Sequence, residues 1–117
     1  MVEVFAGTSG WVYDWNEGGN LEWYIEHSGL NAVELNASFY RFPFPSQVKS
    51  WSSKGGRLRW AVKVHRSITH TRRMGESALE VWRRFRERFQ PLDPLIDFYL
   101  LQLPPSFAAT EEAIRRL

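Results

Sequence analysis

The sequence has no cysteine, few lysines and no long apolar run, and the lack of cysteine and of a long apolar run each exclude a class of protein or site. Without cysteine, a disulfide scaffold, a cysteine-ligated zinc site and a thiol nucleophile are all excluded. A membrane helix needs about 20 consecutive apolar residues, and no stretch approaches that length. The first seven residues have neither the basic region nor the apolar length of a signal peptide. We therefore expect a soluble cytoplasmic protein with no membrane partner.

The chain also has little excess charge. Fifteen Lys and Arg residues face 13 Asp and Glu residues, and the formal net charge of +2 excludes a histone-like polycation. Arginine outnumbers lysine 12 to 3, which, together with the missing cysteine, is in keeping with a source that grows at high temperature.

With 44% hydrophobic residues and six tryptophans, 117 residues suffice for one domain with a core and are too few for two. We expect a single domain over residues 1–117.

Apolar runs of strand length alternate with helical patterns along the chain. Strands are predicted at residues 2–7, 31–36, 58–65 and 97–103. Helices are predicted from Asn20 to Gly29, over 46–53, from Ser77 to Pro91, and from Thr110 onward. Asn20 is a helix-capping residue type, and Ser77 with Glu80 has the spacing of a capping box. The apolar face of the third helix is predicted to carry Ala78, Leu79, Trp82, Phe85 and Phe89.

This alternation predicts an α/β fold with a parallel sheet and right-handed crossovers. A TIM-barrel of eight (β/α) units needs roughly 250 residues, or about 31 for each unit. The chain therefore has room for about four of the eight units, which predicts a TIM-barrel-like half-barrel. An open four-stranded α/β sheet is the competing interpretation.

Polar side chains interrupt the predicted strands in a regular way. Glu34 and Asn36 share one parity, opposite to Val33 and Leu35 of the same strand. Lys63 and His65 likewise share one face of the third strand, and Gln102 lies near the carboxyl end of the fourth. We expect the polar set to meet at the C-terminal mouth of the barrel, where active sites of this architecture lie.

These residues suggest a catalytic arrangement, and each also has a structural alternative. Glu34 would be a general base, Lys63 an electrostatic stabiliser, and His65 a third catalytic group. Glu34 and Lys63 are alternatively a structural ion pair, and His65 alternatively a hydrogen-bonded wall residue. Asn36 and Gln102 alternatively satisfy backbone groups of loops.

The loops that follow the strands supply candidate binding residues. Between Lys63 and Arg73 the chain has six basic or histidine side chains and no acid, which suits a phosphate or carboxylate. Aromatic residues in the first two loops suit a planar base or a sugar face. A solvated charge run and aromatics buried under a loop are the alternatives. The substrate-binding candidates are Thr8, Ser9, Trp11, Asn36, Tyr40, Arg41, His70, Arg72, Arg73 and Gln102.

Cofactor and metal motifs are missing from the sequence. There is no Walker loop, no G-x-G-x-x-G, no G-x-S-x-G and no H-E-x-x-H. We expect no cofactor. We also expect no metal, although a composite site of Glu34, His65 and His70 is an alternative.

Four sequence blocks, in order, cover nearly the whole chain. They are GTSGWVY at 7–13 followed by Trp15, VELNASFYRFP at 33–43, WAVKVH at 60–65 with ITH at 68–70, and LQLPPSF at 101–107. In these blocks the sequence resembles the YecE-like family, also called domain of unknown function 72. The resemblance implies a TIM-barrel-like fold and no established reaction.

The sequence departs from that family pattern at three points. Ser38 stands where the family usually has threonine, which keeps a hydroxyl, and His65 stands where a small residue or proline is usual. Members of the family run to about twice this length. The resemblance therefore covers an N-terminal half, and any catalytic residue on strands five to eight lies outside this chain.

Three hypotheses of function follow. The first is a TIM-barrel-type enzyme, such as a hydrolase, acting on an anionic sugar- or base-containing substrate. The second is a non-catalytic module that binds nucleic acid or a phosphorylated metabolite. The third is a half-barrel that depends on association, because the face with Phe98 and Leu100 would be left in water. Its partner would be a second copy, forming a twofold dimer, or the missing C-terminal half.

Overall fold

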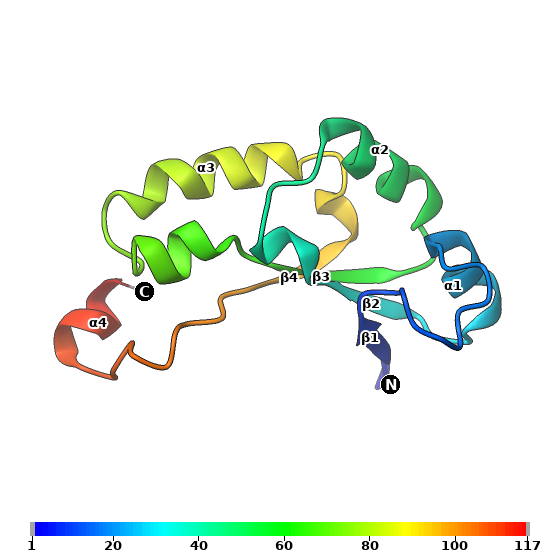
Figure 1. Ribbon diagram of the computed structural model, residues 1–117, viewed down its shortest axis with the longest axis horizontal. Helices are drawn as coiled ribbons and strands as arrows, with labels where there is room; N and C mark the ends of the chain where they lie inside the picture. Colours follow the sequence, from blue (N-terminus) through cyan, green and yellow to red (C-terminus); the bar gives the residue numbers. More distant parts are fainter. Residues whose placement is uncertain (1, 117) are drawn as a thin grey trace.

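The computed structural model describes residues 2–116 and contains one four-stranded parallel sheet. The strands run in the order β1 (Gly7–Ser9), β2 (Ala32–Leu35), β3 (Arg59–Lys63) and β4 (Ile96–Leu100). The helices are α1 (Leu21–His27), α2 (Pro45–Lys54), α3 (Ala78–Arg88) and α4 (Glu111–Arg116). The predicted α/β class and the alternation of strand and helix are confirmed (Figure 1).

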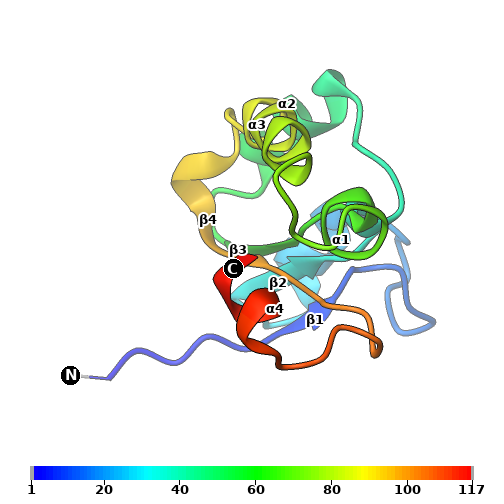
Figure 2. The same cartoon turned by 90° about the vertical axis from the view of Figure 1, so that its left-hand side faces the viewer.

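Three helices cover one face of the sheet. Figure 1 and Figure 2 both show α1, α2 and α3 on the same side, with α4 set apart after a long irregular segment. The covered face is apolar because Val33, Leu35, Trp60 and Val62 point into it, and all four are buried. Within the described residues no helix is long and apolar enough to cross a membrane.

We call the other side of the sheet the open face. Strand register places alternate residues there: Ser9, Glu34, Ala61, Lys63, Phe98 and Leu100. Phe98 is 71% exposed and Leu100 is 40% exposed. The sheet formed by residues 2–116 is thus covered on one side, and β1 and β4 are its edges.

The start of α1 follows the sequence prediction. Asn20 Oδ1 accepts a hydrogen bond from the Trp23 N–H at 2.9 Å, which satisfies one of the free donors of the first turn. The helix ends at His27, and Gly29 follows with φ of +75°. Glycine suits this left-handed conformation because it has no Cβ.

The first strand is shorter and later than predicted. Residues 2–6 lie outside the sheet ladder, and β1 begins at Gly7. The Asn31 side chain holds this segment by accepting from the Ala6 N–H at 2.8 Å and donating to the Val4 carbonyl at 3.0 Å. A Cβ at Gly7 would lie 2.0 Å from the Ala32 carbonyl oxygen, so the close approach of β1 to β2 requires glycine there.

The third helix corrects two predictions. Ser77 makes no capping hydrogen bond; instead, the N–H groups of Ala78 and Leu79 donate to the carbonyls of Gly75 and Glu76. Backbone carbonyls thus accept the hydrogen bonds at the start of the helix, where the sequence predicted a side-chain capping box. Leu79 is 52% exposed and does not share the buried face of the helix.

An irregularity in β4 decides which side chains face which way. Trp60 is paired with Ile96, but Ala61 is paired with Phe98, so Asp97 is an extra residue in the strand. Its carboxylate accepts hydrogen bonds from Arg59 Nε at 3.1 and 3.0 Å. The Arg59 guanidinium lowers the pKa of Asp97 through these bonds.

Candidate functional site

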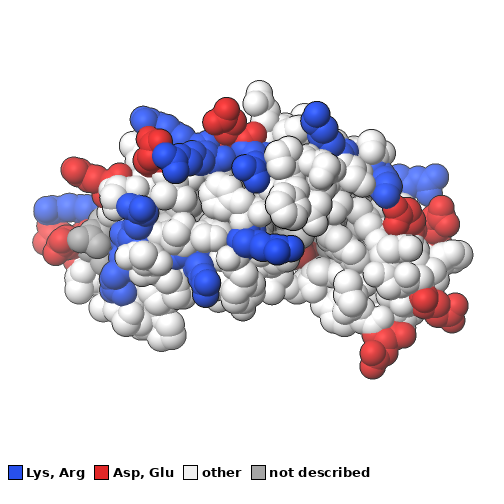
Figure 3. Space-filling model, turned by 45° about the horizontal axis from the view of Figure 1, so that its top comes forward, with Lys and Arg blue, Asp and Glu red and all other residues white. Residues whose placement is uncertain are grey.

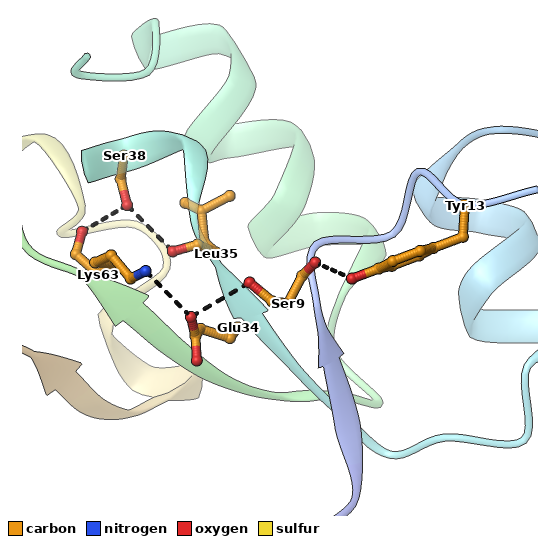
Figure 4. Close-up of polar contacts among 6 residues, drawn as sticks. All are labelled: Ser9, Tyr13, Glu34, Leu35, Ser38 and Lys63. Atoms are coloured by element: carbon orange, nitrogen blue, oxygen red, sulfur yellow. Dashed lines mark hydrogen bonds and ion pairs between the residues drawn. The ribbon is translucent and has the colours of Figure 1, made fainter. Parts of the chain in front are cut away.

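A carboxylate and an ammonium meet on the open face. Lys63 Nζ lies 3.9 Å from Glu34 Oε1, and Ser9 Oγ donates to the same carboxylate oxygen at 3.4 Å (Figure 4). The three side chains come from the C-terminal ends of β1, β2 and β3, where Ser9 is the register partner of Glu34. We call Ser9, Glu34 and Lys63 the Glu34 cluster. Sequence parity predicted that Glu34 and Lys63 share a face, and they do.

The lysine of this cluster is held from both ends. Its backbone carbonyl accepts a hydrogen bond from Ser38 Oγ at 2.6 Å, and its Nζ lies 5.7 Å from the centroid of the Phe39 ring. The Lys63 side chain is 12% exposed and that of Glu34 is 32% exposed. The Nζ–Oε1 separation of 3.9 Å is longer than an ion-pair hydrogen bond of about 2.8 Å, so the two groups form an ion pair without a short hydrogen bond.

His65 lies outside the Glu34 cluster, which corrects the expected parity. β3 ends at Lys63, so the alternation of faces does not extend two residues further. The His65 ring instead packs edge-on against Phe42, with centroids 5.1 Å apart, and its Nδ1 accepts from the Ser67 N–H at 3.1 Å. Burial lowers the pKa of His65, and a hydrogen bond with the Tyr40 backbone partly opposes this effect. Through these contacts His65 fixes the conformation of the loop after β3.

Within the described residues the two candidate amides make no hydrogen bond to the cluster. Asn36 follows β2, and its carbonyl accepts from the Phe39 N–H at 3.0 Å to begin a short 3-10 turn, η1 (Ala37–Phe39). Gln102 lies beyond the end of β4 and is exposed. Over residues 2–116 neither side chain hydrogen-bonds to Glu34 or Lys63. Their predicted place near the cluster and their binding role both stay predictions.

β1 and the loop after it divide their three candidates between the two faces. Thr8 points toward the helices, where its Oγ1 donates to the Gly10 carbonyl at 2.7 Å. Trp11 packs edge-on against Trp51 and Trp60, with ring centroids 5.9 and 6.1 Å away. Only Ser9 reaches Glu34, and the Tyr13 hydroxyl donates to the Ser9 carbonyl (Figure 4).

The loops after β2 and β3 form a rim of cations on aromatic rings. Arg66 lies over Tyr40 at 5.8 Å and Arg41 over Phe44 at 5.9 Å, measured to the ring centroids. Tyr40 is 58% exposed and Phe44 62%. We call Tyr40, Arg41, Phe44 and Arg66 the basic–aromatic rim. Sequence reasoning did not select Phe44 or Arg66 as binding residues, although Arg66 belongs to the basic loop that it did single out.

The remaining basic candidates have structural partners. His70 packs edge-on against Phe39, with ring centroids 5.0 Å apart. Arg73 donates to Ser106 Oγ at 2.9 Å and to its carbonyl at 3.1 Å, joining two loops. Arg72 is exposed at the end of the π-helical turn η2 (Ser67–Thr71). Their part in anion binding stays a prediction.

Residues 5–117 match the family model described as protein of unknown function DUF72. The chain belongs to the DUF72 family.

Two curated relatives match the chain with the same identity and the same coverage. The UPF0759 protein YecE of Escherichia coli strain K12 and that of E. coli O157:H7 are each 30% identical to the chain over 112 residues. The match covers 92% of this chain and 40% of each relative. The chain therefore spans about two fifths of the length of the curated relatives it matches.

Solved DUF72 structures share the fold. A crystal structure of a DUF72 family protein from Enterococcus faecalis V583 matches with a TM-score of 0.78 and 23% identity, over 94% of this chain and 43% of that one. A second crystal structure of a DUF72 protein from that organism gives 0.71 and 22% with the same coverage. These similarities support the α/β fold of this DUF72 chain and carry no activity or substrate.

A separate cavity of about 960 Å³ lies between α3, β4 and α4 of the DUF72 chain. Its wall is largely apolar and includes Met74, Trp82, Tyr99 and Leu101. The Tyr99 hydroxyl donates to Asp93 Oδ1 at 2.7 Å, and burial raises its pKa. No residue of the Glu34 cluster or of the basic–aromatic rim lines this cavity.

The alternative metal site is not assembled. Among the described residues no group of three or more His, Asp or Glu side chains is placed to hold a metal ion. Glu34 is paired with Lys63, whereas His65 and His70 pack against Phe42 and Phe39.

Proposed function

We propose that this chain contributes the Glu34 cluster to the active site of a TIM-barrel-type hydrolase for an anionic, sugar- or base-containing substrate. One observation carries the proposal: Glu34 and Lys63 face each other, 3.9 Å apart, at the C-terminal ends of two neighbouring strands. Parallel strands in α/β enzymes present their active sites at that end. The half-barrel architecture is part of the same proposal.

Glu34 is suited to act as the base. Its carboxylate is the acceptor of the cluster, it retains access to solvent, and Ser9 Oγ donates to one of its oxygens. In hydrolysis this carboxylate would take a proton from the attacking water. Lys63 Nζ would stabilise the negative charge that develops on the substrate, because a fixed cation in a partly desolvated site acts most strongly on a developing charge.

The basic–aromatic rim is suited to hold the substrate. Tyr40 and Phe44 are largely exposed aromatic side chains, of the kind against which a sugar or planar base packs. The guanidinium groups of Arg41 and Arg66 lie over the same rings and supply donors for a phosphate or carboxylate. Binding and chemistry would thus be divided between the rim and the Glu34 cluster.

A second candidate function is binding without catalysis. The rim alone supports it, because alternating exposed rings and arginines suit nucleic acid or a phosphorylated metabolite. This function needs no contribution from Glu34. Single substitutions in the two groups of residues therefore distinguish the candidates.

The test combines binding and turnover. Tryptophan fluorescence is titrated with AMP and with ribose 5-phosphate, and hydrolysis of p-nitrophenyl phosphate and p-nitrophenyl glycosides is measured in parallel. We expect Glu34→Gln to lower turnover about 100-fold or more while binding persists, and Arg66→Ala to weaken binding. Glu26→Gln, at a 67% exposed carboxylate on α1, is the matched control. Saturable binding without turnover by the wild-type chain would favour the second candidate.

A further inference from the structure

We propose that Ser9 is a nucleophile, which attacks the phosphorus of a phosphate monoester and is transiently phosphorylated. This inference deepens the proposed function and rests on its assignment of Glu34 as the base. It names the substrate class, a phosphate monoester of a sugar or nucleoside, and it replaces direct attack by water with two successive displacements.

The Ser9 hydroxyl is directed at the carboxylate of the cluster. Its Oγ donates to Glu34 Oε1 at 3.4 Å, and the two residues are register partners on β1 and β2 (Figure 4). A serine needs an adjacent base to act as a nucleophile, and without substrate this bond is often longer than the usual range of about 2.6–3.2 Å. Among the serines of residues 2–116, Ser9 is the one whose hydroxyl donates to a carboxylate.

The base is itself held by a third group. Lys63 Nζ lies 3.9 Å from Oε1 of Glu34, the same oxygen that accepts from Ser9. The Lys63 side chain is largely buried, and Ser38 Oγ fixes its backbone by donating to the carbonyl. A nucleophile, a base and a group that orients the base are the arrangement typical of an activated serine.

Ser9 combines a fixed backbone with an accessible hydroxyl. It is the last residue of β1, and Gly10 turns the chain with φ of +77° while its N–H donates to the Glu34 carbonyl at 2.7 Å. The Tyr13 hydroxyl donates to the Ser9 carbonyl. Ser9 is nevertheless exposed, whereas Ser38 is buried and donates to two backbone carbonyls. A substrate can therefore reach the hydroxyl of Ser9 but not that of Ser38.

The charge around Ser9 gives Lys63 a particular part in binding an anionic substrate. Residues 1–40, which include Ser9 and Glu34, contain six acidic residues and no Lys or Arg. Figure 3 shows most cations over the left and middle of the molecule and carboxylates at its lower right. Lys63 places an ammonium group within the cluster, where it would offset the charge of a phosphate held at Ser9.

The reaction consists of two displacements at phosphorus. In the first, Glu34 takes the proton of Ser9 Oγ, and Oγ forms a bond to phosphorus. The bond from phosphorus to the ester oxygen breaks, and this oxygen keeps the electron pair, takes the proton from Glu34 and leaves as an alcohol. In the second, Glu34 takes a proton from water, the water oxygen bonds to phosphorus, and Oγ leaves and recovers the proton. The sum is hydrolysis of the monoester to an alcohol and phosphate, with water as the co-reactant.

The first test labels the nucleophile. The chain is incubated with diethyl p-nitrophenyl phosphate, whose diethylphosphoryl group would stay on the serine, and the modified residue is located by peptide mass spectrometry. We expect a label at Ser9 and labelling at least about 10-fold slower in Glu34→Gln. Ser46→Ala, at an exposed serine of α2, is the matched control and should be labelled at Ser9 as fast as the wild type. A folded wild-type chain without a label at Ser9, or an undiminished rate in Glu34→Gln, would overturn the proposal.

The second test separates this inference from the proposed function. Hydrolysis of p-nitrophenyl phosphate is measured for the wild type, Ser9→Ala and Glu34→Gln, and far-UV circular dichroism verifies that the variants are folded. We expect both variants to lose turnover about 100-fold or more. Turnover retained in Ser9→Ala but lost in Glu34→Gln would overturn the nucleophile and leave a hydrolase in which water attacks directly. A label at Ser9 without turnover by the wild type would overturn the hydrolase and support the nucleophile.

Discussion

The Glu34 carboxylate and the Lys63 ammonium point at each other across 3.9 Å on the open face of the sheet, from strands that are direct neighbours. Lys63 is the less exposed of the two, and its position depends on the loop after β2, because Ser38 Oγ donates to its carbonyl. The geometry of the Glu34 cluster is therefore set partly by a residue that does not belong to it.

Removing the Ser38 hydroxyl should destabilise the fold. Ser38 is 1% exposed, and its Oγ lies 2.6 Å from the Lys63 carbonyl and 3.3 Å from the Leu35 carbonyl. Ser38→Ala leaves these acceptors without their donor, at a cost of about 1–3 kcal/mol in the free energy of unfolding. Ser38→Thr, which keeps the hydroxyl, should cost less. Urea unfolding measures the stability of both variants, with Ser46→Ala, at an exposed residue of α2, as the control. Equal losses for Ser38→Ala and Ser38→Thr would contradict the explanation.

The two helix starts should respond differently to alanine. Asn20→Ala removes the acceptor of the Trp23 N–H and should cost about 1 kcal/mol. Ser77→Ala should change stability by less than about 0.5 kcal/mol, because Ser77 makes no capping bond and backbone carbonyls serve α3 instead. Denaturant midpoints of the two variants give the comparison. Equal losses would show that Ser77 does cap the helix in solution.

Truncation of a core phenylalanine should be far more costly than truncation of an exposed one. Phe85 is fully buried and packs against Phe89, with ring centroids 4.7 Å apart. Phe85→Ala should therefore lose about 3–5 kcal/mol, the range for a phenylalanine that leaves a cavity. Phe44→Ala, at a 62% exposed side chain, should stay within about 0.5 kcal/mol of wild type. Thermal and urea unfolding at one protein concentration would test the difference.

Stability should fall on acidification through the titration of His65. Burial lowers the pKa of His65 in the folded state below its ordinary value of 6.5, so the unfolded chain takes up this proton first as the pH falls. The stabilising contribution of the neutral ring is complete above pH 6.5 and is lost as the pH drops toward the folded pKa. His65→Gln should flatten the change of urea midpoint between about pH 7.5 and about pH 5.5. Parallel profiles for variant and wild type would refute this assignment.

Elements with strong local signals were predictable from the sequence. The periodic apolar positions gave the order of strands and helices, and Asn20 marked the start of α1. Parity along two central strands placed Glu34 and Lys63 on one face, because period-two alternation holds wherever a strand remains regular.

The failures arise where the regular pattern stops. His65 follows the end of β3, so its direction is decided by Phe42 and Ser67 instead of by strand parity. The segment before Gly7 is bound by the Asn31 side chain, a contact across 25 residues that no local pattern reveals. Ser77 was assigned as a cap from its residue type, whereas a backbone turn had already supplied the acceptors. The basic–aromatic rim depends on the relative placement of two loops, which the sequence does not specify.

The extra residue in β4 has a consequence for how much length variation this strand tolerates. Because Asp97 has no register partner of its own, deleting it would let Ile96 and Phe98 follow each other opposite Trp60 and Ala61. Every later side chain of β4 would stay on its present face, and the contact with Arg59 would be the part lost. An insertion or deletion at any regularly paired residue of the strand would instead exchange the two faces from that point onward. Position 97 is thus a place in β4 where the chain can lose a residue without turning Phe98 and Leu100 toward the helices.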